Sequence, residues 1–225
     1  MKKIYLLLTL VSIANLGYSQ NVLFYDNFNN STYTWKPSSN AYVNSGSSRL
    51  YIAWNQEPSN NNGSIICPIE LNQNDDFTIE TSMTLKEGAI GNGIVWNYKN
   101  DNEFYRFLIT DRDGQYVVNH YQNGDKESLV SWTTSSTINQ KFARNKLEIR
   151  KQGSKTSFYI NGSLVNSVDN INYDGSRLGI YLGALKDAKL EVDYYKITTS
   201  KGTTNYSNSN LSSGSRKDTP PRPSL

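Results

Sequence analysis

The side chains that most often carry out catalysis are scarce in this sequence. His120 is the only histidine and Cys67 the only cysteine among 225 residues. A single histidine excludes a His-Glu-x-x-His zinc site, and no Gly-x-Ser-x-Gly segment offers a serine nucleophile. The lone cysteine excludes an intrachain disulfide, and its apolar surroundings in Ile65–Pro68 predict a small buried side chain. We therefore expect neither nucleophilic nor zinc chemistry.

The elements that would position any other site are β-strands, and three of them lie together in Gly91–Tyr121. Val, Ile, Tyr, Phe and Trp fill its runs, while the polar segments 99–102 and 111–114 interrupt them as turns. Just before this meander, residues 76–86 alternate apolar and polar side chains. That alternation predicts a half-buried antiparallel strand.

Further strands on both sides of the meander complete the expected structure. Asn161-Gly162 between apolar runs is the strongest hairpin signal, and Asn123-Gly124 is a second. No segment keeps an apolar period of 3.6 residues, so negligible helix is expected. We predict an all-β fold, an antiparallel jelly-roll sandwich of two sheets and about a dozen strands. The other expected strands are 22–28, 49–54, 64–71, 127–133, 145–151, 155–160, 163–168, 178–185 and 189–197.

The two ends of the chain differ in composition from the middle. Residues 1–19 join two lysines to an apolar run, as a secretory signal peptide does, and one β-sandwich domain is expected over 20–199. Residues 200–225 are rich in Ser, Asn and Pro, which predicts a disordered tail. The short leader resembles those of Bacteroidetes-type bacteria. We therefore expect a bacterial protein that is secreted, periplasmic or on the cell surface, with no membrane insertion after leader removal.

The charge of the middle segment argues against nucleic-acid binding. The formal net charge is +3, but the leader contributes +2 and the tail +3, which leaves −2 for the domain. A nucleic-acid binder needs a basic stripe, and none is visible in the sequence. Nucleic acid is therefore not an expected partner.

Four segments carry a resemblance to the concanavalin A-like lectin/glucanase superfamily, in the broad laminin-G-like sense. Phe24–Phe28 with Trp35 resembles the Asp-x-Phe…Trp opening of these sandwiches, and Gly93–Phe107 resembles their Gly-Ile-Val-Phe…Tyr-Tyr-Arg-Phe hairpin. Asn145–Val165 is the most recognisable segment, and Leu190–Tyr195 is similar to their last strand. The resemblance implies a concanavalin A-like jelly roll. It leaves function open, because this fold hosts lectins, glycosidases and adhesion modules.

Related glucanases carry their catalytic carboxylates in a Glu-x-Asp-x-x-Glu strand. The nearest match here is Glu191–Lys196, which has a lysine at the second glutamate position and lies on the closing strand. Glycoside hydrolysis needs two carboxylates that face one sugar, so catalysis through this motif is not expected. A hydrolase of the same fold with carboxylates elsewhere stays open as an alternative.

In many sandwiches of this superfamily a calcium ion joins the first strand to the last. The resemblance places Asp26 in the opening strand and Asp193 in the closing strand at matching positions. Two carboxylates in contact repel each other unless a cation or a proton neutralises them. A structural calcium ion held by Asp26 and Asp193 is therefore the predicted cofactor. The alternative is that each carboxylate caps a turn or faces water.

The predicted ligand site is the sheet face built from the meander, since sugar sites combine aromatic rings with Arg, Asn, Asp or Gln. Trp96 and Tyr98 are expected to share one face of their strand. The resemblance implies that Tyr105 and Phe107 point to the core, so Arg106 should point away from it. The candidate ligand-binding residues are Arg106, Trp132, Trp96, Tyr98, Tyr116 and His120.

The expected function is that of a secreted, non-catalytic module that binds a glycan or a cell-surface polysaccharide. A glycoside hydrolase and a structural or adhesion domain are the alternatives. Two carboxylates on the face of Arg106 would favour the hydrolase. A large exposed apolar patch would favour the adhesion domain.

Overall fold

Antiparallel strands make up the described part of the chain. The computed structural model describes residues 21–29, 31–37, 42–44, 49–53 and 61–200, so the predicted signal peptide and nearly all of the predicted tail lie outside these ranges. The described residues contain no helix, and so none that could span a membrane. The strands are β1 (Asn21–Asp26), β2 (Lys36–Pro37), β3 (Tyr42–Asn44), β4 (Leu50–Ala53), β5 (Asn61–Ile66), β6 (Phe77–Asn100), β7 (Glu103–Thr110), β8 (Gln115–Gln122), β9 (Asp125–Thr134), β10 (Asn145–Gln152), β11 (Lys155–Ile160), β12 (Ser163–Asp169) and β13 (Arg177–Thr199).

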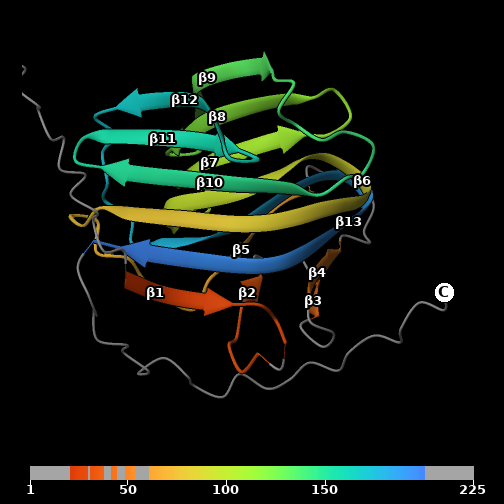
Figure 1. Cartoon of the computed structure of the whole chain (residues 1–225), viewed down its shortest axis with the longest axis horizontal. Coiled ribbons are helices and arrows are strands. Elements are labelled where there is room, and N and C mark those ends of the chain that lie inside the picture. Colours follow the sequence, from red (N-terminus) through yellow and green to blue (C-terminus); the bar gives the residue numbers. More distant parts are fainter. Residues whose placement is uncertain (1–20, 30, 38–41, 45–48, 54–60, 201–225) are drawn as a thin grey trace, which may run out of the picture.

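Two long strands, β6 and β13, run through both layers of a two-sheet sandwich (Figure 1). Their segments 77–87 and 189–199 pair in sheet I, with β10, β11 and β12 on one side and β1, β4 and β3 on the other. Their segments 91–98 and 177–183 pair in sheet II, between β7, β8 and β9 on one side and β5 and β2 on the other. The predicted all-β sandwich is confirmed. Each long strand replaces two shorter strands that the sequence predicted.

The main core lies between the two sheets. Phe77, Ile79, Met83 and Leu85 on alternate positions of β6 are buried in it, as the alternation in the sequence predicted. Cys67 directly follows β5 and is 3% exposed, and burial raises the pKa of its thiol far above the usual value. The prediction of a small buried cysteine side chain is confirmed. Other members of this core are Trp96, Tyr105, Phe107, Leu147, Ile149, Phe158, Ile160, Leu190, Val192 and Tyr195.

A β-bulge at Asn97 sets the direction of the side chains at the end of β6. Asn97 has a φ of 50°, and the pairing of β6 with β7 shifts between Trp96 and Asn100. An extra residue in one strand reverses the alternation of the side chains that follow it. Trp96 therefore lies in the main core, while Tyr98 belongs to a second cluster on the outer face of sheet II. The prediction that these two aromatic residues share a face was wrong.

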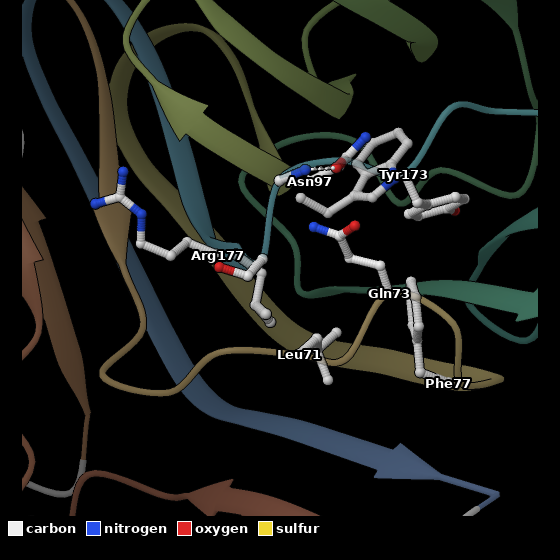
Figure 2. A pocket seen from close by; sticks show the side chains of 10 residues that line it. Leu71, Gln73, Phe77, Asn97, Tyr173 and Arg177 are labelled. Atoms are coloured by element: carbon white, nitrogen blue, oxygen red, sulfur yellow. Dashed lines mark hydrogen bonds between the residues drawn. The ribbon is translucent and has the colours of Figure 1, made fainter. Parts of the chain in front are cut away.

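The Asn97 side chain holds the loop that leads into β13. Its Oδ1 accepts hydrogen bonds from the backbone N–H of Asp174 (3.0 Å) and Gly175 (2.5 Å), and its Nδ2 donates to the carbonyl of Asn172 (2.6 Å). Figure 2 shows Asn97 beside a cavity of about 10 Å³, which has room for about one water molecule. Labelled residues that line the cavity with it are Leu71, Gln73, Phe77, Tyr173 and Arg177.

Candidate functional site

The outer face of sheet II carries a cluster of side chains that is separate from the main core. Its buried apolar members are Ile66, Val95, Tyr98, Phe104, Leu108, Val117 and Tyr181, with Tyr121 packed at its margin. Cross-strand pairing places Arg106 of β7 opposite Asn119 of β8, and Asn119 opposite Ser128 of β9. We call this surface the arginine face. It is defined by two arginines and the four rings around them: Arg106, Arg177, Tyr98, Phe104, Tyr121 and Tyr181.

Arg106 makes four contacts with three residues of this face, Asn119, Tyr121 and Tyr181. Its guanidinium carbon lies 4.7 Å from the ring centroids of both Tyr121 and Tyr181. Its Nε donates to Oδ1 of Asn119 (3.2 Å), and one Nη donates to the hydroxyl of Tyr181. Asn119 in turn donates from Nδ2 to the hydroxyl of Ser128 (3.0 Å). Contacts of this kind fix the orientation of a guanidinium before any ligand arrives.

The ionisation of Tyr181 fits its role as an acceptor. Burial raises the pKa of Tyr181 to about 12, although the nearby Arg106 guanidinium acts in the opposite direction. The phenol therefore stays neutral near pH 7, and its oxygen accepts a hydrogen bond from Arg106 without cancelling the positive charge. The charge of Arg106 is preserved at the surface of the sheet.

The rings of the arginine face form a continuous aromatic layer. Phe104 and Tyr121 stack with centroids 4.6 Å apart and planes 11° from parallel, and Phe104 also lies 6.0 Å from Tyr98 and 6.3 Å from Tyr181. The guanidinium of Arg177 lies 4.8 Å from the centroid of Tyr98. Offset and tilted arrangements at these distances are favourable for aromatic pairs. The layer therefore supports both arginines.

Two of the other predicted ligand-binding residues belong to this face. Tyr98 lies in its cluster because of the bulge at Asn97. Trp132 is 44% exposed on β9 and directly precedes Thr133, which lies opposite the inward-facing Tyr116. The pairing of β9 with β8 is irregular here, with Ser131 and Trp132 together opposite Val117, a member of the outer cluster, so Trp132 points to the outer face of sheet II. Arg106 and Trp132 are therefore on the same side of the sandwich.

The remaining three predicted residues lie on the inner side of sheet II. Trp96 and Tyr116 are members of the main core, with 1% and 3% of their surfaces exposed. His120 pairs with inward-facing Tyr105, and the two rings stack with centroids 4.0 Å apart. The expectation that Tyr116 and His120 join the face of Arg106 was wrong. Strand parity decides this, since even-numbered residues of β8 face the core.

Sequence reasoning missed four contributors to the arginine face, namely Asn119, Tyr121, Arg177 and Tyr181. Asn119 and Tyr121 could have been predicted, because the turn at 111–114 fixes the register of β7 against β8. That register places Asn119 opposite Arg106 and Tyr121 opposite Phe104. Arg177 and Tyr181 belong to β13, which joins sheet II only through long-range pairing. No local signal in the sequence points to them.

The outer face of sheet I has a different character. A groove of about 220 Å³ is lined by Thr78, Glu80, Lys146, Glu148, Arg150, Lys196 and Thr198. Glu80 and Glu148 lie directly opposite each other on β6 and β10, but each is paired with a cation. Lys146 lies 3.1 Å from an oxygen of Glu80, and Arg150 binds Glu148. The groove is thus a compensated network of ion pairs.

Glu80 should make stability sensitive to acid. Burial alone would raise the pKa of Glu80, but hydrogen bonds donated by Tyr194 (2.7 Å) and Lys146 outweigh it and lower the pKa below the usual 4.5. The carboxyl of Glu80 therefore has a higher pKa in the unfolded chain than in the folded chain. The stabilisation that ionised Glu80 contributes is complete above the unfolded pKa, and it is lost as the pH falls through the folded pKa. We expect the urea midpoint of Glu80→Gln to fall less steeply with decreasing pH than that of the unmodified protein. Glu87→Gln, at an exposed position, is the control, and an equally shallow fall there would contradict the assignment.

The two carboxylates predicted to hold calcium have separate sets of partners. Asp26 is 3% exposed and accepts hydrogen bonds from the backbone N–H of Phe28 (2.8 Å), the hydroxyl of Ser31 (2.7 Å) and Nε1 of Trp35 (2.9 Å). Asp193 instead accepts from Ser82 Oγ and forms ion pairs with Arg49 and Arg144.

This arrangement does not favour a cation shared by Asp26 and Asp193, because protein donors already satisfy both carboxylates. No group of three or more His, Cys, Asp or Glu is placed to hold a metal within the described residues. Calcium binding stays a prediction. It requires that Ca²⁺ raise the melting midpoint, and a midpoint unchanged by EDTA would contradict it.

Comparison with known proteins defines the class of fold. No protein-family model and no curated protein matches this sequence. Among solved structures, the chain is similar to carbohydrate-binding module CBM66 from Bacillus subtilis (14% identity, TM-score 0.52, covering 77% of this chain and 96% of that one). It is also similar to a native glycosidic hydrolase (13% identity, TM-score 0.58, covering 80% of this chain and 97% of that one). A third similar structure is Bacillus licheniformis β-glucanase (15% identity, TM-score 0.53, covering 79% of this chain and 97% of that one). The chain has the concanavalin A-like β-sandwich fold.

Proposed function

We propose that this protein is an exported, non-catalytic module that binds carbohydrate through the arginine face. The observation that carries the proposal is Arg106, fixed between two tyrosine rings with the exposed Trp132 on the same side of the sheet. A ring to stack on and a fixed polar donor are the two elements that sugar recognition needs. The similar structures include a carbohydrate-binding module and glycoside hydrolases, which supports a carbohydrate ligand. Export would be checked by N-terminal sequencing of the mature protein.

The composition of the arginine face favours binding over catalysis. Register places no Asp or Glu among the described outward-facing residues of its strands. Asp101, in the turn after β6, accepts a hydrogen bond from the hydroxyl of Tyr98 (2.7 Å) at the margin. A glycosidase needs two carboxylates on opposite sides of the scissile bond. Glu80 and Glu148 lie on the other sheet and are engaged with cations.

The exposed apolar residues do not favour an adhesion domain. The large ones belong to β1, β9, β12 and loops of the described chain, and none of these elements carries more than two of them. They are Val22, Tyr25, Tyr33, Trp132, Phe142 and Leu164.

Pull-down with a panel of insoluble polysaccharides tests the proposed function. We expect the mature protein to bind at least one of them, and Arg106→Ala and Trp132→Ala each to weaken binding about tenfold or more, as loss of a stacked ring or charged donor does. Arg150→Ala is the matched control, because that guanidinium also stacks on a tyrosine, Tyr159, but on sheet I. Failure to bind any polysaccharide, or equal loss in the control, would contradict the proposal. Thermal melts confirm that each variant folds.

A further inference from the structure

The arginine face carries positive charge that the described residues do not neutralise. Four of the six arginines in the described ranges have a carboxylate oxygen within 4.0 Å: Arg49, Arg112, Arg144 and Arg150. Arg106 and Arg177, the two on the arginine face, form no ion pair with any described residue. The contrast separates this face from the rest of the protein.

Neutral groups alone contact these two guanidiniums in the described structure. Arg106 is only 9% exposed and uses Nε and one Nη for Asn119 and Tyr181, which leaves its other Nη nitrogen without a described partner. Arg177 donates to the carbonyl of Lys99 and lies over Tyr98. A largely buried cation without a counter-charge is costly, and a bound anion removes that cost.

Two further cations share this face. Lys36 lies opposite Ile66 on β5, and Lys126 lies opposite Tyr121 on β8, so register turns both lysines to the same side as the cluster. Both are exposed. Four cations therefore surround the aromatic layer, with Asp101 as the carboxylate at its margin. The positive field of this face contrasts with the −2 formal charge of the predicted domain.

We infer that the ligand of the arginine face is an anionic saccharide, whose carboxylate or sulfate is bound by Arg106 with help from Arg177. This inference rests on the proposed function and specifies its ligand class. The planar guanidinium fork matches the paired oxygens of a carboxylate or a sulfate. The aromatic layer provides the apolar surface for the sugar ring beside the charge.

Affinity measurements on three soluble polysaccharides test the inference: polygalacturonate, dextran sulfate and uncharged dextran. We expect a carboxylated or a sulfated chain to bind and uncharged dextran not to bind. Arg106→Ala and Arg177→Ala should each weaken binding about tenfold or more, because each removes a charged hydrogen-bond donor. Arg106→Lys keeps the charge but loses the fork, and it should bind less tightly than the unmodified protein. Arg150→Ala should bind normally.

Each outcome decides for or against the anionic ligand. Binding of only one charged polysaccharide supports the inference and identifies the source of the anion. If the protein binds both charged polysaccharides and the Arg106 and Arg177 variants bind them equally well, the inference is overturned, because the binding is then unspecific electrostatic attraction. Arg106-dependent binding of a neutral polysaccharide overturns the inference but leaves the proposed function standing. No binding to any chain in this test or in the pull-down panel overturns both.

Discussion

Asn97→Ala is expected to lower the free energy of unfolding by about 4 kcal/mol. The change removes three side-chain hydrogen bonds to the loop at 172–175, each worth about 1 kcal/mol. It also places a Cβ-bearing residue without a compensating side-chain bond at a φ of 50°, which costs roughly 1–2 kcal/mol more. Urea unfolding, compared with the unmodified protein, measures the loss.

Two further variants at the same position separate the causes. Asn97→Gly removes the hydrogen bonds but permits the positive φ, so it should lose less stability than Asn97→Ala. Asn97→Asp keeps the acceptor for Asp174 N–H and Gly175 N–H, but it loses the donor to Asn172 and places a carboxylate oxygen against that carbonyl, so it should still destabilise the fold. If alanine and glycine destabilise equally, backbone strain makes no contribution at this bulge. If all three changes are neutral, the Asn97 side chain does not hold the loop.

Asp26→Ala is expected to cost slightly more, about 5 kcal/mol. The carboxylate accepts three hydrogen bonds, and hydrogen bonds to charged groups contribute roughly 1.5–3 kcal/mol each. Removing it leaves Nε1 of Trp35 buried without its acceptor, and Trp35 packs against Phe28 and Tyr195 in the core. The N-terminal strand should therefore detach more readily. Urea unfolding measures the change.

Trp35→Phe is the matched partner of this variant, because it removes the buried donor together with the need for an acceptor. In a double-mutant cycle, the two changes should be non-additive by about 1 kcal/mol or more, since they share one hydrogen bond. Additive effects would show that the Asp26–Trp35 contact contributes little. The same proteins with and without EDTA show whether calcium takes part.

Local sequence patterns predicted much of the fold. The alternation in 76–86 placed Phe77, Ile79, Met83 and Leu85 in the core, and the Asn-Gly pairs marked the hairpins before β9 and β12. These signals are reliable because period-2 burial and the positive φ of hairpin turns are encoded by residues next to one another. Positive φ is observed at Asn123, Gly124, Asn161 and Gly162.

The same patterns failed where a single backbone irregularity reversed them. Tyr98 was expected beside Trp96, but the bulge at Asn97 adds one residue relative to β13 and turns Tyr98 outward. The signal was an asparagine in a strand of apolar residues. Its meaning depends on the loop at 172–175, which is distant in sequence and supplies the partners that stabilise the bulge.

The sequence by itself determined that this protein is an antiparallel β-sandwich without an intrachain disulfide, and its resemblance to a known superfamily implied that Arg106 points away from the core. Only the tertiary structure decided that Arg106 is clamped by Tyr121 and Tyr181 and that Arg177 shares its face. The physical reason is that strand formation follows local alternation, whereas a site on a sheet face is assembled by register between distant strands. A domain with a net negative formal charge can therefore present a cationic face that no stretch of its sequence reveals.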